Sequence, residues 1–216
     1  MKMKDVKLII SLLIAWIIIL PVAAQSNQNA VKVLNNTVSL LQKNAIQTNF
    51  ELTVKESASA KAQKMNGSFL MQGNKFVLNT SEMKVCFDGK TQWSYLPDVN
   101  EVSITNPTEK ELAQTNPLAL LQAYKNKSTI RFAAKNTVKA FHTIELLPKS
   151  KESDFQKIIV IVNKSNSFPQ SIQLTDKKGM NTLLTLTQFK TGIKTNNSTF
   201  TFITKNYKDI EINDLR

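Results

Sequence analysis

The chain has 216 residues, a formal net charge of +12 and a single cysteine, Cys86. One cysteine excludes an internal disulfide, and the alternating segment 83–87 predicts that Cys86 is a small strand residue, not a reactive thiol. The lysines that carry the charge are spread singly along the chain, whereas nucleic-acid readers cluster Arg with exposed aromatics. We therefore expect no nucleic-acid partner. Solvated strand faces explain the charge most simply, and an anionic membrane surface or an acidic partner stays open.

Residues 1–24 have the order of a secretory signal. Lysines 2, 4 and 7 precede the uncharged apolar run 8–20, and Pro21 and the small residues Ala23 and Ala24 follow it. A membrane-spanning helix needs about 20 apolar residues, so this run is too short to be one. We predict cleavage before Gln25 and a single mature domain of residues 25–216. Because Gln25 is not a cysteine, we expect the mature protein to be unlipidated.

The mature chain is predicted to open with a helix and to continue with strands. Asn27 or Asn29 can cap the helix, whose apolar positions recur at helical spacing through to about Lys43: Val31, Leu34, Val38 and Leu41. The period then changes to two, which predicts strands at 46–54, 67–72, 75–79, 82–87, 91–96 and 101–105. Turn residues such as Asp88-Gly89 separate them, so neighbouring strands should pair antiparallel.

Two short helices should interrupt these strands. Thr108 and Glu111 have capping-box spacing, and Pro117 follows Asn116 at the start of a second helix. Strands resume at about 128–134, 138–147, 155–163, 168–176, 181–190 and 199–203. The fold class is thus α+β and mainly β: one large, strongly curled antiparallel sheet whose apolar face the helices cover.

The sequence lacks a catalytic constellation. His142 is the only histidine, and metal and nucleophile sites need partners within reach. No phosphate-binding glycine loop, nucleophile elbow or Cys-x-x-Cys motif occurs. We therefore expect a protein that is not an enzyme and that uses no cofactor and no metal.

Apolar residues at alternate strand positions are the main candidates for a binding surface. They are Phe50, Leu52, Phe69, Met71, Phe76, Leu78, Met83, Val85, Trp93 and Tyr95. The helix pair adds Leu112, Leu118, Leu121 and Tyr124. By the pleat, each strand's set shares one face. Such a face either packs as an ordinary core or lines a cavity, and composition does not separate the two.

The order of several motifs resembles that of the LolA family of periplasmic lipoprotein carriers. They are the segment from Gly67-Ser68-Phe69 to Lys75-Phe76, the hairpin Asp88-Gly89-Lys90-Thr91-Gln92-Trp93-Ser94-Tyr95, the helix Pro117-Leu118-Ala119-Leu120-Leu121, the strand end Leu146-Leu147-Pro148 and the turn Asp176 to Gly179. Together they extend over most of the mature chain. One departure is Val77, which stands where the family usually has an Arg that helps hold its helices closed.

The resemblance implies an unclosed antiparallel β-barrel, or half-barrel, with a helical lid over an apolar cavity. The ten strand residues above would line the cavity, and the four helix residues would belong to the lid. The function implied is a periplasmic carrier or chaperone that binds the acyl chains of lipoproteins and shuttles them from the inner to the outer membrane. Its transient partners would be an inner-membrane release complex and an outer-membrane acceptor, and we expect a monomer.

Three other functions remain open at this stage. The same fold could carry another lipid or a glycolipid. It could also serve as a lipoprotein-sensing adaptor, although the chain has no second domain for a partner. A small hydrolase would need the catalytic constellation that is absent.

Overall fold

The computed structural model describes residues 22–134 and 138–216. Most of the predicted leader therefore lies outside the described residues, as does the predicted strand boundary at 135–137. In the described chain, twelve strands form one sheet in the order β12-β6-β5-β4-β3-β2-β1-β11-β10-β9-β8-β7. Because β7 and β12 are opposite edges of this order, the sheet is an open half-barrel, which confirms the expected fold class.

The strands agree closely with the sequence pattern in the first half of the chain. They are β1 (Ile46–Lys55), β2 (Gln63–Gln72), β3 (Lys75–Thr80), β4 (Lys84–Phe87), β5 (Gln92–Leu96) and β6 (Glu101–Thr105). The second half contributes β7 (Ser128–Phe132), β8 (Phe141–Pro148), β9 (Phe155–Asn163), β10 (Pro169–Asp176), β11 (Asn181–Lys190) and β12 (Glu211–Asp214). Neighbours pair antiparallel as predicted, except for β12, which runs parallel to β6.

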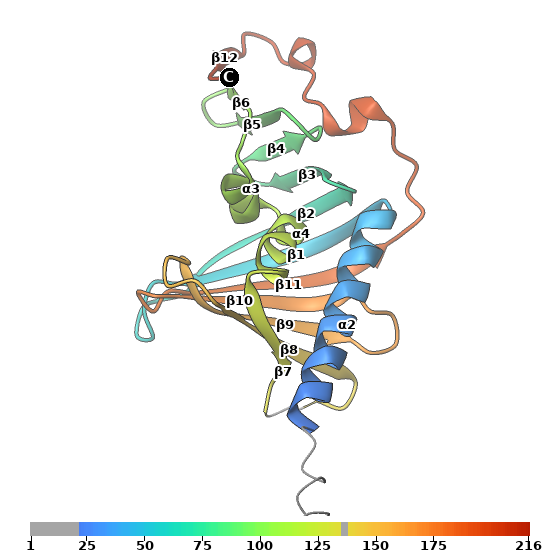
Figure 1. Cartoon of the computed structure of the whole chain (residues 1–216). Helices are drawn as coiled ribbons and strands as arrows, with labels where there is room; N and C mark the ends of the chain where they lie inside the picture. Colours follow the sequence, from blue (N-terminus) through green and yellow to red (C-terminus); the bar gives the residue numbers. More distant parts are fainter. Residues whose placement is uncertain (1–21, 135–137) are drawn as a thin grey trace, which may run out of the picture.

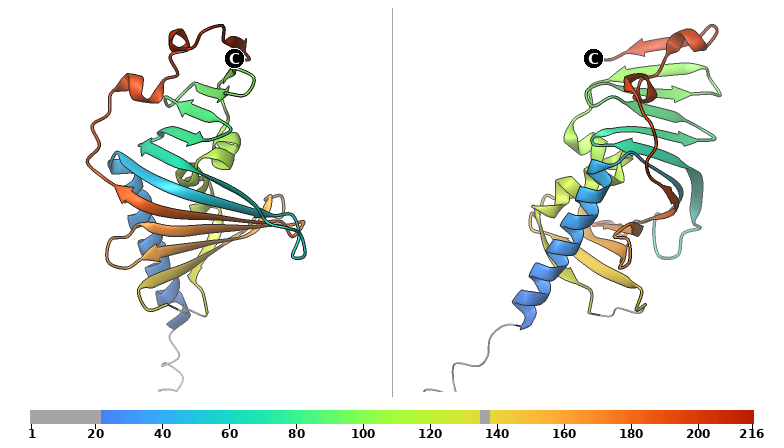
Figure 2. Two further views of the ribbon diagram at one scale, coloured as in Figure 1. Left: turned by 180° about the vertical axis from the view of Figure 1, so that it is seen from behind. Right: turned by 90° about the vertical axis from the view of Figure 1, so that its right-hand side faces the viewer.

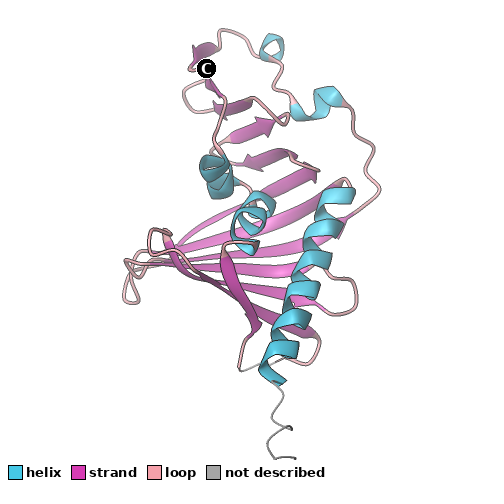
Figure 3. Ribbon diagram, in the orientation of Figure 1, coloured by secondary structure: helices cyan, strands magenta, loops and turns pink. Residues whose placement is uncertain are grey.

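Three helices lie on one side of the sheet (Figures 1 and 3). Helix α2 (Val22–Lys43) crosses the strands of the second half, and α3 (Glu109–Thr115) and α4 (Pro117–Lys125) lie nearer the middle. The side view in Figure 2 shows that the sheet twists strongly between its two edges. This twist makes the helix-covered face concave.

Helix α2 begins at Val22 in the described chain, earlier than the predicted caps Asn27 and Asn29. Its buried stripe consists of Ala30, Leu34, Thr37, Val38 and Leu41. Val31, which the helical spacing placed in the stripe, is instead 36% exposed. The hydroxyl of buried Thr37 donates to the carbonyl oxygen of Ser167 at 3.0 Å, which satisfies its polar group and ties the helix to a distant turn.

The helix pair starts as its capping residues predict. The Thr108 hydroxyl accepts from the Glu111 amide at 3.4 Å, and the Glu111 carboxylate accepts from the Thr108 amide at 2.7 Å. Asn116 Oδ1 accepts from the Leu118 amide at 2.9 Å, so it caps α4 at the residue before Pro117. Both caps hold backbone donors that a short helix would otherwise leave unpaired.

Two separate apolar clusters lie on the two faces of the sheet. The inner cluster joins α2 and α4 to the concave face and includes Leu34, Phe69, Phe76, Leu121 and Ile158. The outer cluster is smaller and consists of Val77, Cys86, Val102, Phe200 and Phe202, with half-buried neighbours. Its phenylalanines come from the C-terminal segment.

The C-terminal segment corrects the predicted strand at 199–203. Residues 191–216 form two 3₁₀ turns, η1 (Asn197–Phe200) and η2 (Thr204–Asn206), and then strand β12. This strap crosses the outer face of β3–β6 before β12 adds to the edge of the sheet (Figure 2). The apolar residues of 199–203 are buried against the outer face, so their spacing suggested a strand although the backbone forms a turn.

Candidate functional site

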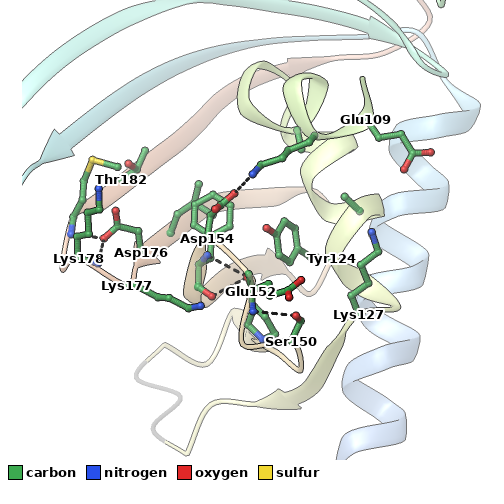
Figure 4. A pocket seen from close by; sticks show the side chains of 18 of the residues that line it. Glu109, Tyr124, Lys127, Ser150, Glu152, Asp154, Asp176, Lys177, Lys178 and Thr182 are labelled. Carbon is green, nitrogen blue, oxygen red and sulfur yellow. Dashed lines mark hydrogen bonds and ion pairs between the residues drawn. The ribbon is translucent and has the colours of Figure 1, made fainter. Parts of the chain in front are cut away.

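A cleft opens between the helix pair and the turns β8–β9 and β10–β11 (Figure 4). Its volume is about 980 Å³. The helix pair lines it with Glu109, Lys110, Ala113, Ala123 and Tyr124. The other lining residues lie mainly in the segments 148–155 and 174–182.

The floor of this cleft is apolar. Ala113, Tyr124, Phe155 and Leu174 line it, and the same four residues pack against the inner cluster. The rings of Tyr124 and Phe155 meet edge to face with centroids 5.4 Å apart. An apolar ligand in the cleft would therefore be in contact with the side chains that cover the core.

Among the described residues, one ion pair links the helix pair to the turn across the cleft. Lys110 Nζ on α3 lies 2.9 Å from Asp154 Oδ2 on the β8–β9 turn. The hydrogen bond to Asp154 raises the pKa of Lys110 above its usual value. Because both side chains are more than half exposed, at 72% and 56%, water screens this contact and it can open readily.

The structure brings eight of the ten predicted strand residues to the inner face. Phe50, Phe69, Met71, Phe76 and Val85 are buried there, and Leu52, Leu78 and Met83 are half-buried against them. Phe76 stacks between Phe69 and Phe87, with ring centroids 5.3 and 5.5 Å away. None of the ten lines the large cleft in this conformation, so they form a filled core beside it.

Trp93 and Tyr95 do not join the other eight. In the β4–β5 pairing Cys86 is opposite Trp93, and Cys86 belongs to the outer cluster. Tyr95 packs outside as well, 5.2 Å from Phe202 and 4.6 Å from Tyr207 between ring centroids. The expectation that these two aromatics face the interior is wrong, because the register of the hairpin at Asp88-Gly89 puts the odd positions of β5 outside.

Val77 also faces outward. It is buried in the outer cluster and is opposite Cys86. A longer side chain at this position would point away from the helix pair. The latch that the resemblance places here is therefore absent from residue 77, and the Lys110–Asp154 ion pair and the Tyr124–Phe155 ring contact connect the helix pair to the opposite side of the cleft.

The four predicted helix residues lie over the inner cluster. Leu118 and Leu121 are buried, while Leu112 and Tyr124 are half-buried. Leu112 and Leu118 also line a second cleft of about 300 Å³ on the side of the turns β2–β3 and β4–β5. The helix pair thus lies between two clefts, and its movement would uncover the buried Leu118 and Leu121 unless a ligand replaced their packing.

The sequence missed Phe155 and Leu174 as cleft residues. Leu174 alternates with buried Ile172, which was a usable signal. The alternation of apolar residues could not place Phe155 on the inner face, because the β9–β10 register shifts between Thr175 and Asp176 and leaves an extra residue in β9. Such a bulge changes which face the following side chains occupy.

The described residues hold no group of three or more His, Cys, Asp or Glu side chains that could bind a metal. His142 stacks on Phe132 with ring centroids 5.3 Å apart, and burial, with a smaller effect of Lys164, lowers its pKa. Burial raises the pKa of the Cys86 thiol to about 11, against the opposing influence of Lys84. His142 therefore packs as a ring against its neighbour, and Cys86 packs as a buried thiol in the outer cluster.

None of the helices in the described part of the chain is long and apolar enough to cross a membrane.

Residues 20–179 match the protein family described as outer membrane lipoprotein carrier protein LolA. A comparison with curated proteins finds no match. Among solved structures, the chain is similar to an uncharacterized conserved protein from Thermus thermophilus, with TM-score 0.58 and 13% identity over 86% of this chain and 99% of that one. A LolA superfamily protein from Nitrosomonas europaea gives TM-score 0.46 and 13% identity over 80% and 97% of the two chains.

Proposed function

Because the chain belongs to the LolA family of outer membrane lipoprotein carriers, we propose that it is a carrier that binds lipoprotein acyl chains on the concave face of its sheet. It takes them from the inner to the outer membrane as a monomer free in the periplasm, processed before Gln25 and unlipidated. A release complex in the inner membrane supplies the cargo and an acceptor in the outer membrane removes it. A carrier of another lipid or glycolipid is the alternative.

The observation that carries this proposal is the apolar cleft that continues into the inner cluster. An acyl chain in water costs about 0.8 kcal/mol per CH₂, so a carrier has to bury it along most of its length. The cleft floor offers the first contacts. A longer chain then replaces the packing of Leu112, Leu118 and Leu121 on the inner face as the helix pair moves outward.

Reversibility follows from the same arrangement. When the cargo leaves, the helix leucines return to the inner face, so the empty protein does not expose its apolar surface to water. Two short helices with capped ends can move as a unit, because their own hydrogen bonds do not depend on the sheet.

The test compares two adjacent leucines of β11 that face opposite ways. Leu184 packs against the inner cluster, whereas Leu183 is exposed on the outer face. In titrations with a fluorescent fatty acid, Leu184→Gln should bind at least about tenfold more weakly than the wild type, because a buried amide without a partner opposes an apolar ligand. Leu183→Gln should bind like the wild type. Circular dichroism verifies that both variants are folded.

Equal binding by the two variants, or no saturable binding by the wild type, would contradict the proposal. Mass spectrometry of what co-purifies with the exported protein decides between a lipoprotein and another lipid.

The ion pair across the cleft gives a kinetic prediction. Asp154→Asn removes the charge that holds Lys110, so the helix pair should open more often and the fatty-acid probe should bind faster in stopped flow. Glu152→Gln, on the same turn, is the matched control because Glu152 forms no ion pair in the described part of the chain. An unchanged association rate in Asp154→Asn would show that the pair does not restrain the helices.

A further inference from the structure

Alternate hairpin turns of an antiparallel sheet lie at the same end of its strands. In this sheet, one end therefore carries in spatial order the turns β5–β6, β3–β4, β1–β2, β10–β11 and β8–β9. The last three converge at the left of Figure 1, beside the cleft. They form one end of the half-barrel opening.

The sign of the charge changes along this row of turns. Residues 81–83 and 97–100 contain Glu82 and Asp98 and no lysine. The three turns beside the cleft, together with the start of β7, are rich in lysine. We call six of these side chains the basic rim: Lys55, Lys61, Lys127, Lys151, Lys177 and Lys178.

Backbone contacts show that the basic rim is continuous. Lys55 is opposite Asn181 in the β1–β11 pairing, which places the β1–β2 hairpin beside the β10–β11 turn. The amide of Lys177 donates to the carbonyl oxygen of Asp154 at 3.3 Å. Next along the row, the amide of Lys149 donates to the carbonyl oxygen of Lys127 at 2.9 Å.

The lysines of the rim outnumber the carboxylates of the same turns. All six side chains are exposed, and none forms an ion pair within residues 22–134 and 138–216. The three turns also carry four carboxylates, which are Glu56, Glu152, Asp154 and Asp176. Of these, Asp154 is held by Lys110. Asp176 accepts the amides of Lys178 and Met180, each at 2.8 Å, and so stabilises its own turn.

The cleft opens within this rim. Lys127, Lys177 and Lys178 belong to the rim and also line the cleft, and Figure 4 shows them together with Tyr124 and Asp154. A surface that attracts the rim would therefore meet the mouth of the cleft. The acidic turns of the same row would hold the other half of the molecule away from an anionic surface.

We propose that the basic rim docks the protein on an anionic lipid surface with the mouth of the cleft toward the bilayer. Phospholipid headgroups supply the complementary charge, and each lysine near such a surface adds to the attraction. Acyl chains then pass between bilayer and cleft with little exposure to water. The docking itself does not depend on what the cleft carries, while its purpose rests on the proposed function.

The experiment measures partition of the protein onto vesicles. The full chain is expressed with its own leader and purified in the form that the cell produces. It is then mixed with phosphatidylcholine vesicles that contain either no phosphatidylglycerol or about 40% of it, which gives a strongly anionic leaflet. We expect binding only to the anionic vesicles, weakened by about 0.5 M salt, at which the Debye length falls to about 4 to 5 Å. The triple variant Lys55→Gln, Lys61→Gln, Lys151→Gln changes rim lysines that do not line the cleft, and it should bind at least about tenfold more weakly.

The matched control makes the same change of charge elsewhere. Lys90, Lys190 and Lys194 are exposed and lie at or beyond the opposite end of the strands, so their triple Gln variant should keep most of the binding. Equal losses in the two triple variants would mean attraction of a basic protein without a docking face, and absent binding to anionic vesicles would mean a protein partner or none. Either result overturns the proposal.

Orientation gives an independent readout. Cys86 is buried and protonated near neutral pH, so a fluorophore can be attached to a new surface thiol. Anionic vesicles should shift the emission of a label at Ser59→Cys, in the β1–β2 hairpin, and leave a label at Asn206→Cys unchanged. The reverse pattern would refute the docking face. Fatty-acid binding in solution should persist in the rim variant, so failure of docking and failure of the carrier function are distinguishable.

Discussion

Gly67→Ala is expected to destabilise the protein by about 3 kcal/mol or more, a large share of the stability of a single domain. A Cβ atom at residue 67 would lie 2.2 Å from the carbonyl oxygen of Asn79 and 2.7 Å from the ring of Phe50. Phe50 is opposite Gly67 in the β1–β2 pairing and lies over it on the inner face. The ring and the backbone of β3 would both have to move, which disturbs the centre of the sheet.

Gly73→Ala is the matched control. Its Cβ would meet no atom within 4 Å, and the change costs only the strain of a positive φ, 61°, which is about 1 kcal/mol. Chemical denaturation of both variants measures the free energies of unfolding. A Gly67→Ala loss no larger than that of Gly73→Ala would show that the close approach of Phe50 is not required.

Phe200→Ala is expected to loosen the C-terminal strap and to expose the Cys86 thiol. Phe200 is 1% exposed and belongs to the outer cluster with Val77 and Cys86, so its loss should cost about 3 to 5 kcal/mol of the strap's packing. The labelling rate of Cys86 by a disulfide reagent at about pH 8 should rise at least about tenfold, because local opening then exposes the sulfur far more often.

A core variant on the other face controls for general destabilisation. Phe69→Ala removes a comparable ring from the inner cluster, which contains no cysteine. It should lower the free energy of unfolding by a similar amount while changing the labelling rate much less. If both variants label equally fast, Cys86 reacts only after global unfolding and the strap does not open on its own.

Local sequence signals predicted most of the fold. Alternation and the turn residues around Gly73 and Gly89 placed the early strands within a few residues, and Thr108 and Asn116 fixed the starts of the two short helices. Side-chain period and capping are short-range properties, so the sequence displays them directly. The match of residues 20–179 to the LolA family agrees with the resemblance drawn from the motifs.

The candidate site was less accessible, because it depends on relations between distant strands. Alternation shows that Trp93 and Tyr95 share a face, but only the β4–β5 register shows that this face is the outer one. The bulge that precedes Ile158 turns Phe155 toward the cleft, and no local pattern announces it. The short strand β12 was not predicted, because its four residues at the edge of the sheet include only one apolar residue and show no alternation.

The sheet between the two apolar clusters acts as a partition between two independent sets of constraints. In β3 and β4, Phe76 and Phe87 belong only to the inner cluster, while Val77 and Cys86 belong only to the outer one. Substitutions on opposite faces should therefore add in their effects on stability. A lineage could change the concave face to suit a different cargo while the strap side stayed as it was, and the outer face could acquire new surfaces at little risk to binding.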